Sequence, residues 1–310
     1  MARFILWRIV QLPLVLAVVY LITFALVWLA PGSPYGNNDR ALSEAAKNDL
    51  KARFHAQSWE QFLGYYPWQI LRHGDFGPSL SYEGWSVNDV MRESLPVSIS
   101  LGLLAIFIAL ICGCAAGVTA ALRRGGVLDF LSLAVALVGI SLPSFVVAGL
   151  LIVVFSDWLH WFPSGGWGQF RQMILPAVAL ALMPMAYIAR LTRVSMLDTL
   201  GLDFVRTARA KGLPRRTVVW KHAFRTAFLP VFTFLGPATA NAMTGSFVVE
   251  IVFNIPGLGQ HFVNGVKNRD QTLILGTVLV YAAFLLTLNL LVDIGYAAID
   301  PRIEIAEKKE

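Results

Sequence analysis

The stretch RTARAKGLPRRTVVWKHAFRTAFLP occupies residues 206–230 and lies between two long apolar segments. It carries seven Lys or Arg and no Asp or Glu. Gly212 and Pro214 divide it, because glycine permits a left-handed stop and proline prevents a helix from continuing. The pattern therefore predicts a short helix, a turn and a second helix that leads into the next apolar segment.

Both predicted helices are amphipathic. In the first, one side can be apolar and the other basic: Phe204, Val205 and Ala208 against Arg206, Arg209 and Lys211. In the second, an apolar set is flanked by a basic one: Val218, Val219, Ala223 and Phe224 against Arg215, Arg216 and Lys221. The element could lie on anionic lipid, anchor the topology, or dock into a groove on a cytoplasmic partner. A turn of defined shape favours docking, because lipid requires no such turn.

The composition indicates a membrane protein. Of 310 residues, 56% are hydrophobic and 14% charged, and the mean hydropathy is +0.63. A soluble domain has about 25% charged residues. The net charge of +6 might suggest a nucleic-acid partner. However, no soluble domain is left to carry a basic face, and the basic residues cluster at the ends of apolar runs, so nucleic acid is excluded.

Six apolar runs are long enough to cross a bilayer as helices, a step that takes about 20 residues. They are 9–29, 97–122, 130–155, 173–189, 228–249 and 272–292. The first is longer than the apolar core of a signal peptide, and we expect it to be retained. If both termini are cytoplasmic, the inner segments hold sixteen of the 25 Lys and Arg. Six of the nine outer ones lie in the long loop 31–95, which counts little in the positive-inside rule, so a cytoplasmic N terminus is predicted.

The loop 31–95 is predicted to be a small folded extracytoplasmic element with short helices, because it has too many aromatic residues for a disordered linker. Its histidines, His55 and His73, are a weak metal signal. Cys112 and Cys114 both lie inside an apolar run and point to different sides of a helix. We therefore expect neither a disulfide nor a metal site.

Two spans carry stripes of related residues. The second has a small residue at every fourth position: Ala105, Ala109, Gly113, Gly117 and Ala121. Such a stripe lets another helix approach closely, either in a mobile bundle or in ordinary packing. The fifth has a polar stripe: Thr233, Pro237, Asn241 and Thr244. Asn241 and Thr244 could line a translocation path or form hydrogen bonds between helices.

Ionisable residues are almost absent from the middle of the spans. Asp293 comes nearest, at the end of the sixth span. A carrier driven by protons or sodium usually needs carboxylates at mid-membrane depth, so the energy for transport is expected to come from outside this chain. The sequence also lacks a G-x-x-x-x-G-K-[ST] phosphate loop, H-E-x-x-H and G-x-S-x-G, which argues against an ATPase and against a membrane enzyme.

Several motifs resemble the permeases of ABC importers. RTARAKGL and HAFRTAFLP are similar to their cytoplasmic coupling loop. The motifs APGSP, HGDFGPS, SLPVS, GSFVVEIVFNIPGLGQ and DIGYAAIDPR extend the resemblance over essentially the whole chain and point to the B-type subunit of the oligopeptide and dipeptide branch. The general loop pattern opens Glu-Ala-Ala, whereas positions 206–208 read Arg206, Thr207 and Ala208. The distance from Gly212 to the Leu-Pro at 229–230 also exceeds that of the general pattern.

The resemblance implies an all-α membrane protein of the ABC importer permease type, with six transmembrane helices and an extracytoplasmic element between the first two. Its parts would be 1–30, 31–95, a five-helix core over 96–300 with a coupling loop at 198–225, and a cytoplasmic tail at 301–310. The residues implied in ATPase coupling are Arg206, Ala208, Arg209, Lys211, Gly212 and Leu213. No catalytic, metal-binding or cofactor-binding residue is implied in this chain.

The implied function is ATP-driven import of oligopeptides across a bacterial inner membrane. The implied partners are a second homologous permease, two cytoplasmic ATPases that hold ATP and Mg²⁺, an extracytoplasmic peptide-binding protein and membrane lipid. Within the branch, dipeptides, glutathione or nickel are alternative substrates. A secondary carrier that works alone is a more distant alternative, and uptake by the purified chain under an ion gradient would reveal it.

Overall fold

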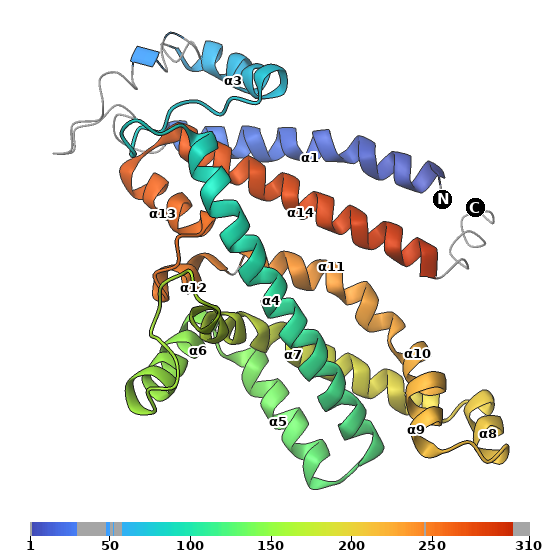
Figure 1. Ribbon diagram of the computed structural model, residues 1–310. Coiled ribbons are helices and arrows are strands. Elements are labelled where there is room, and N and C mark those ends of the chain that lie inside the picture. The colour runs from blue at the N-terminus through green and yellow to red at the C-terminus, as the bar shows by residue number, and fades with distance from the viewer. Residues whose placement is uncertain (1, 30–47, 50–51, 53–57, 245, 300–310) are drawn as a thin grey trace. The chain divides into compact units, whose positions relative to one another are not determined.

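The computed structural model describes residues 2–29, 48–49, 52, 58–244 and 246–299 (Figure 1). Its elements, where η marks a π-helix, are α1 (Ala2–Leu29), α3 (Trp59–His73), α4 (Val87–Leu122), α5 (Val127–Ser141), α6 (Ser144–Leu151), η1 (Ile152–Trp158), α7 (Phe170–Leu200), α8 (Asp203–Ala210), α9 (Arg215–Thr217), η2 (Val218–Ala223), α10 (Phe224–Ala227), α11 (Leu229–Thr244), α12 (Ser246–Val252), α13 (Leu258–Asn268) and α14 (Gln271–Ile299). Within these ranges the β-structure is limited to one isolated bridge between Pro78 and Ser86.

Among the described residues, the predicted apolar runs are helical apart from short breaks such as the one at Leu142 and Pro143. By length and composition α1, α4, α7 and α14 could each cross a membrane. α5 and the continuous segment α6–η1 make a fifth span if they count as one, although the chain bends by 110° between Ser141 and Ser144. Pro143 lies at this bend, as expected for a residue that breaks helical hydrogen bonding. α11 contains a shorter apolar stretch, Leu229–Thr239. The fold is therefore all-α, but the third and fifth predicted runs are not single long helices.

The chain divides into two compact units. One combines Met1–Ser98 with Pro256–Leu290, and the other combines Ile99–Ile255 with Leu291–Glu310. The predicted tail 301–310, and His55 within the predicted loop 31–95, lie outside the described residues.

The first unit has an aromatic core. Tyr20 and Phe24 of α1 pack with Phe62 and Tyr66 of α3, joined by leucines from the 79–86 turn and α14. The Tyr20 and Tyr66 rings stack with centroids 6.2 Å apart. The Tyr66 hydroxyl donates to the carbonyls of Phe76 and Thr272, at 3.2 and 3.3 Å. Because the phenol is buried, its pKa lies well above the ordinary value. α3 therefore confirms that the long loop contains a packed helix.

A buried carboxylate organises the first unit. Asp270 is fully buried and immediately precedes α14. Its Oδ2 accepts hydrogen bonds from Ser79 Oγ and from the backbone N–H groups of Leu80 and Ser81, at 2.6, 2.7 and 2.8 Å. Its Oδ1 accepts from Thr272 Oγ1 and Leu273 N, both at 3.0 Å, which caps α14. One side chain thus ties the 79–81 turn to the start of a helix about 190 residues later in the chain.

In the second unit α4 packs tightly on α7. A Cβ built on Gly117 would lie 2.5 Å from the Ala189 carbonyl oxygen, and one on Gly113 would lie 2.8 Å from the Met185 carbonyl oxygen. The predicted stripe of small residues is therefore buried against another helix, as close helix contact in a membrane requires.

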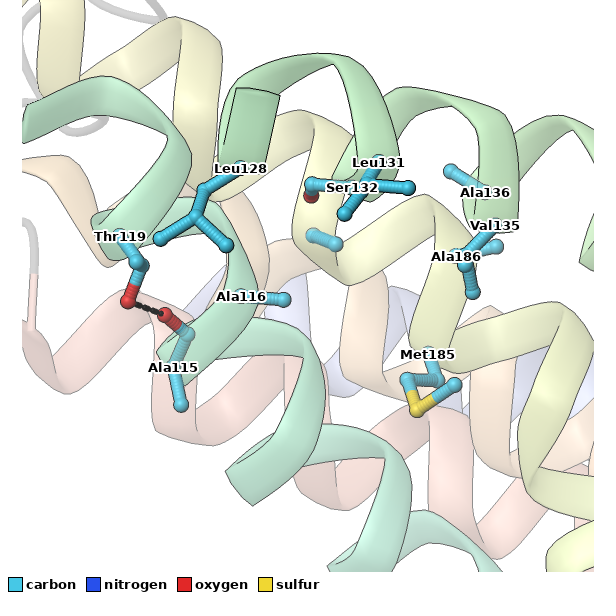
Figure 2. Close-up of a pocket in the computed structure, with 11 residues that line it drawn as sticks. Ala115, Ala116, Thr119, Leu128, Leu131, Ser132, Val135, Ala136, Met185 and Ala186 are labelled. Carbon is cyan, nitrogen blue, oxygen red and sulfur yellow. Dashed lines mark hydrogen bonds between the residues drawn. The ribbon is translucent and has the colours of Figure 1, made fainter. Parts of the chain in front are cut away.

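An apolar groove lies between α4, α5 and α7. It has a volume of about 400 Å³. Alanines from α4 and α7 face leucines and a valine from α5 across it (Figure 2).

Candidate functional site: the basic loop after α7

The helix α8 ends as the sequence predicts. Gly212 has φ +75°, the left-handed conformation that glycine adopts without strain. Its N–H donates to the Arg209 carbonyl at 2.9 Å, and the N–H of Leu213 donates to the Ala208 carbonyl at 3.4 Å. These two bonds form a Schellman motif, which satisfies carbonyls that the helix end would otherwise leave free. Pro214 then precedes the second helical segment, α9–η2–α10.

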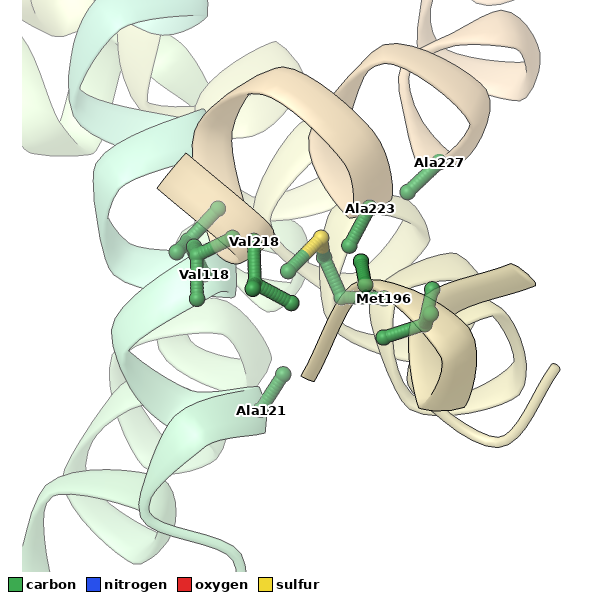
Figure 3. Packing of buried hydrophobic residues seen from close by; sticks show 9 residues of the cluster. Val118, Ala121, Met196, Val218, Ala223 and Ala227 are labelled. Atoms are coloured by element: carbon green, nitrogen blue, oxygen red, sulfur yellow. The ribbon is translucent and has the colours of Figure 1, made fainter. Parts of the chain in front are cut away.

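The inner face of α8 is anchored in a hydrophobic cluster. Val205 and Ala208 belong to one buried cluster with Met196 of α7 and with Val118 and Ala121 of α4. The remaining members come from η2 and α10, and Figure 3 shows the packing. The apolar residues predicted for the second helix behave as expected: Val218, Val219 and Ala223 are buried, and Phe224 is packed against the cluster. The loop is therefore fixed to the ends of two long helices.

The outer face of α8 combines apolar and basic side chains. Phe204 was expected on the buried side with Val205 and Ala208, but it is 44% exposed. The expectation was wrong although Phe204 lies one turn before Ala208: it sits near the start of α8, at the edge of the buried face, and the cluster does not cover its ring. Leu202 and Trp220 are also exposed, at 46% and 49%. Exposed apolar side chains surrounded by charge are typical of a surface that another protein covers.

The residues predicted for coupling divide between these two faces. Ala208 is buried, whereas Arg206, Arg209, Lys211, Gly212 and Leu213 are exposed. Arg206 lies 3.5 Å from Asp203 in an exposed ion pair, which adds little stability. The basic residues of the second segment, Arg215, Arg216 and Lys221, are exposed too. The surface is therefore strongly cationic, with apolar side chains among the charges.

An ion pair that we did not predict from the sequence joins the neighbouring helices α5 and α7. Arg193 of α7 contacts Asp129 of α5 through two bonds: Nε to Oδ1, and Nη2 to Oδ2 at 2.9 Å. Asp129 also accepts from the N–H of Gly125, at 2.9 Å, in the turn between α4 and α5. The partners are 64 residues apart, so no local pattern could have paired them. The pair holds α5 against the half of α7 that leads to the basic loop.

The weaker path prediction is only partly described. Asn241 and Thr244 belong to the backbone of α11, but their side chains lie outside the described part of the structure. Thr233, on the same predicted stripe, is exposed, and its hydroxyl donates to the Leu229 carbonyl of its own helix at 3.1 Å. Among the residues that the structure describes, no three His, Cys, Asp or Glu side chains come together as a metal site would require.

Comparison with known proteins defines the class. The family model described as "Binding-protein-dependent transport system inner membrane component" matches residues 113–305. The oligopeptide transport system permease protein OppB of Escherichia coli (strain K12) is 44% identical over 98% of this chain and 99% of that protein. The dipeptide transport system permease protein DppB of Bacillus subtilis (strain 168) is 42% identical over 99% of this chain and 100% of that protein.

A solved structure shares the fold. The crystal structure of an amino acid ABC transporter with histidines aligns with a TM-score of 0.53 and 15% identity, over 68% of this chain and 94% of that chain. Together with the all-α architecture, these findings define a multi-pass membrane permease of the ABC transporter type. The chain belongs to the family of binding-protein-dependent transport system inner membrane components, in agreement with the resemblance seen in the sequence.

Proposed function

We propose that this chain is one of two permease subunits in an ATP-driven importer of oligopeptides. It forms half of the translocation path with a second, homologous permease. Two cytoplasmic ATPases bind ATP and Mg²⁺ and hydrolyse the nucleotide, and an extracytoplasmic binding protein delivers the peptide. The 44% identity to an oligopeptide permease along nearly the whole chain supports this substrate class.

One observation carries the coupling role: α8 is buried on one side and exposes an apolar, cationic surface on the other. The buried side packs on Met196 of α7 and Val118 of α4. Outside the buried side, α8 exposes Phe204 at one edge and the basic side chains of Arg206 and Arg209 elsewhere on its surface. An ATPase that grips this surface would move α8 and, through the cluster, the ends of α4 and α7. In the proposed topology the surface faces the cytoplasm, as do both termini, and the segment over 31–95 is extracytoplasmic.

Crosslinking tests the docking step. In the assembled complex, Arg209→Cys and Lys211→Cys should each crosslink to an ATPase subunit that carries a cysteine in the surface facing them. Arg171→Cys, before α7 and on the predicted outer side, is the control and should not crosslink. If neither α8 position ever crosslinks while the complex remains assembled, the proposed docking surface is wrong.

Substitution of Gly212 tests coupling. Proline holds φ near −65° and has no N–H, so Gly212→Pro loses both the left-handed turn and the bond to the Arg209 carbonyl. It should abolish peptide-stimulated ATP hydrolysis and uptake in the reconstituted complex while the chain still inserts. Gly212→Asn is the matched control, because asparagine tolerates this conformation and a Cβ here meets no atom within 4 Å. Normal uptake with Gly212→Pro would contradict the assignment.

The path residues and the substrate need separate measurements. Asn241→Leu combined with Thr244→Leu should reduce peptide uptake, and an unchanged rate would exclude these residues from the path.

A dipeptide importer is the second candidate, because the relative from Bacillus subtilis is a dipeptide permease at 42% identity. Stimulation of ATP hydrolysis by peptides of two to five residues distinguishes the two, with the largest response identifying the preferred length.

A further inference from the structure

The groove between α4, α5 and α7 is apolar along its whole length. Its lining has no charged residue, and its two hydroxyl groups belong to Thr119 and Ser132. The Thr119 hydroxyl is already used, because it donates to the Ala115 carbonyl at 2.7 Å (Figure 2). Along α5 the lining runs from Leu128 to Ala136, a rise of about 12 Å at 1.5 Å per residue. The groove therefore suits a slender apolar chain.

One end of the groove is positively charged. Arg123 follows Thr119 by one helical turn, and its N–H still donates to the Thr119 carbonyl at 3.2 Å, so it continues the face that lines the groove. Arg124 is the next residue, and both arginines are exposed. Arg193 continues the lining of α7 one turn beyond Ala189, but its charge is matched by Asp129. Two positive charges thus remain at the mouth beyond that ion pair.

We propose that this groove binds an anionic phospholipid. Part of one acyl chain lies between α4, α5 and α7, and the phosphate lies against Arg123 and Arg124. Binding of such a lipid needs both features of the site: the apolar groove within the spans takes the acyl chain, and the cationic end, at the turn where the protein chain leaves the membrane, takes the headgroup. A whole helix of another subunit cannot be buried in the groove, because 12 Å of helix with its side chains occupies roughly twice the groove volume. A partner helix that only inserted side chains would instead be detected by the crosslinks described below.

The proposal gives the Asp129–Arg193 pair a second consequence. Arg193 pairs with Asp129 and offsets its negative charge, which would otherwise repel the phosphate. Asp129 in turn holds the turn at Gly125, next to the arginines, against α5. The turn that carries Arg123 and Arg124 is therefore held against α5 by Asp129.

Photolabelling tests the site. The assembled complex is placed in phosphatidylcholine vesicles that contain a trace of phosphatidylglycerol with a photoreactive acyl chain, and labelled peptides are mapped by mass spectrometry. Label should concentrate on segments 115–119 and 128–136. Arg123→Gln and Arg124→Gln should each lower that labelling about fivefold at low salt, as expected for a basic residue near an anionic headgroup. Photoreactive phosphatidylcholine should label the same segments no more than the rest of the spans.

Two variants separate filling of the groove from general damage. Thr119→Phe places a ring in the groove and should abolish the concentrated labelling. Leu103→Phe is the control, because Leu103 is an exposed residue of the same helix, about three turns before the lining and absent from it, and labelling should persist. Equal labelling by both lipids, labelling indifferent to the arginines, or crosslinks from Leu131→Cys to a partner subunit in place of lipid would each overturn the proposal.

Discussion

Asp270 shows how much one residue can organise. Its carboxylate is fully buried and accepts five hydrogen bonds, three from Ser79, Leu80 and Ser81 and two from the first turn of α14. Buried donors that lose their acceptor cost about 1–3 kcal/mol each, because they also lose the water that would otherwise solvate them. The stability of the first unit therefore depends strongly on this side chain.

Replacement of Asp270 should be severely destabilising. Asp270→Ala is expected to lower the unfolding free energy by about 3 kcal/mol or more, since several donors are orphaned together. The loss should appear as a lower Tm in detergent and faster proteolysis within 79–86. Glu83→Ala, an exposed carboxylate in the same turn, is the control and should stay within about 0.5 kcal/mol of the parent. Similar behaviour of the two variants would contradict the role given to Asp270.

His261 makes the first unit sensitive to acid. Its Nδ1 lies 2.9 Å from the Tyr82 hydroxyl, and burial lowers the pKa of the imidazole below its ordinary 6.5, although the nearby charge of Glu93 opposes this. The folded state therefore holds His261 neutral, while the unfolded chain takes up a proton below about pH 6.5. This contribution to stability is complete above that pH and is lost as the pH falls through the folded pKa.

The pH dependence is measurable as thermal stability. The Tm should fall between about pH 7.5 and pH 5.5, and His261→Gln should make that fall shallower because the amide does not titrate. His73→Gln, at the exposed end of α3, is the control and should keep the parent slope. An identical slope for His261→Gln would show that other groups cause the effect.

At the scale of elements, α4 and α7 pack closely because glycines of α4 carry no side chain at the contact. Gly117 allows the α7 backbone to approach so closely that any Cβ would clash with the Ala189 carbonyl and with Thr192, at 2.5 and 2.6 Å. Neither obstacle is the flexible end of a long side chain, so the helices would have to separate. Since α8 is anchored to the same two helices through the cluster around Met196, their spacing also sets the position of the basic loop.

A single methyl group should disturb this pair of helices. Gly117→Ala is expected to cost about 1–3 kcal/mol from overpacking, despite the better helix propensity of alanine. The change should lower the Tm of the purified chain and weaken peptide-stimulated ATP hydrolysis of the complex. Gly149→Ala in α6 is the matched control, because a Cβ there meets no atom within 4 Å, and it should be neutral or slightly stabilising. Equal Tm values for the two variants would contradict the close packing.

At the scale of the whole molecule, the distribution of charge predicts which way the chain is oriented in the membrane. Sixteen of 25 Lys and Arg fall on the side predicted to be cytoplasmic, and the basic loop after α7 contributes a large share. Short loops rich in Lys and Arg remain inside because they resist translocation. The proposed coupling to cytoplasmic ATPases requires this orientation.

Cysteine accessibility tests the orientation. In a background with Cys112→Ala and Cys114→Ala, Glu83→Cys should react with a membrane-impermeant maleimide in cells whose inner membrane is intact. Arg216→Cys, in the basic loop, should react only after that membrane is permeabilised. Glu83 and Arg216 are both exposed in this chain. If a cysteine at either position fails to react with the maleimide, the membrane and not burial within the chain would be the cause. The reverse pattern would overturn the topology and the coupling proposal together.

The sequence by itself determined the class of fold, the apolar runs and the stop at Gly212. Each depends on local properties: hydropathy over about 20 residues, and the backbone freedom of one glycine before a proline. It also separated Val205 and Ala208 from Arg206 and Arg209, because helical periodicity assigns neighbours to different faces. The family resemblance rested on motifs that can likewise be read directly from the chain.

Only the tertiary structure decided which distant residues meet. The three bonds from Ser79, Leu80 and Ser81 to Asp270, the Asp129–Arg193 pair and the groove between α4, α5 and α7 all join segments far apart in sequence, and no local pattern indicates such partners. The exposure of Phe204 and the 110° bend beside Pro143 were decided in the same way. The physical reason is that hydropathy and propensity act along the chain, whereas close packing and burial of charge depend on what lies across from each side chain.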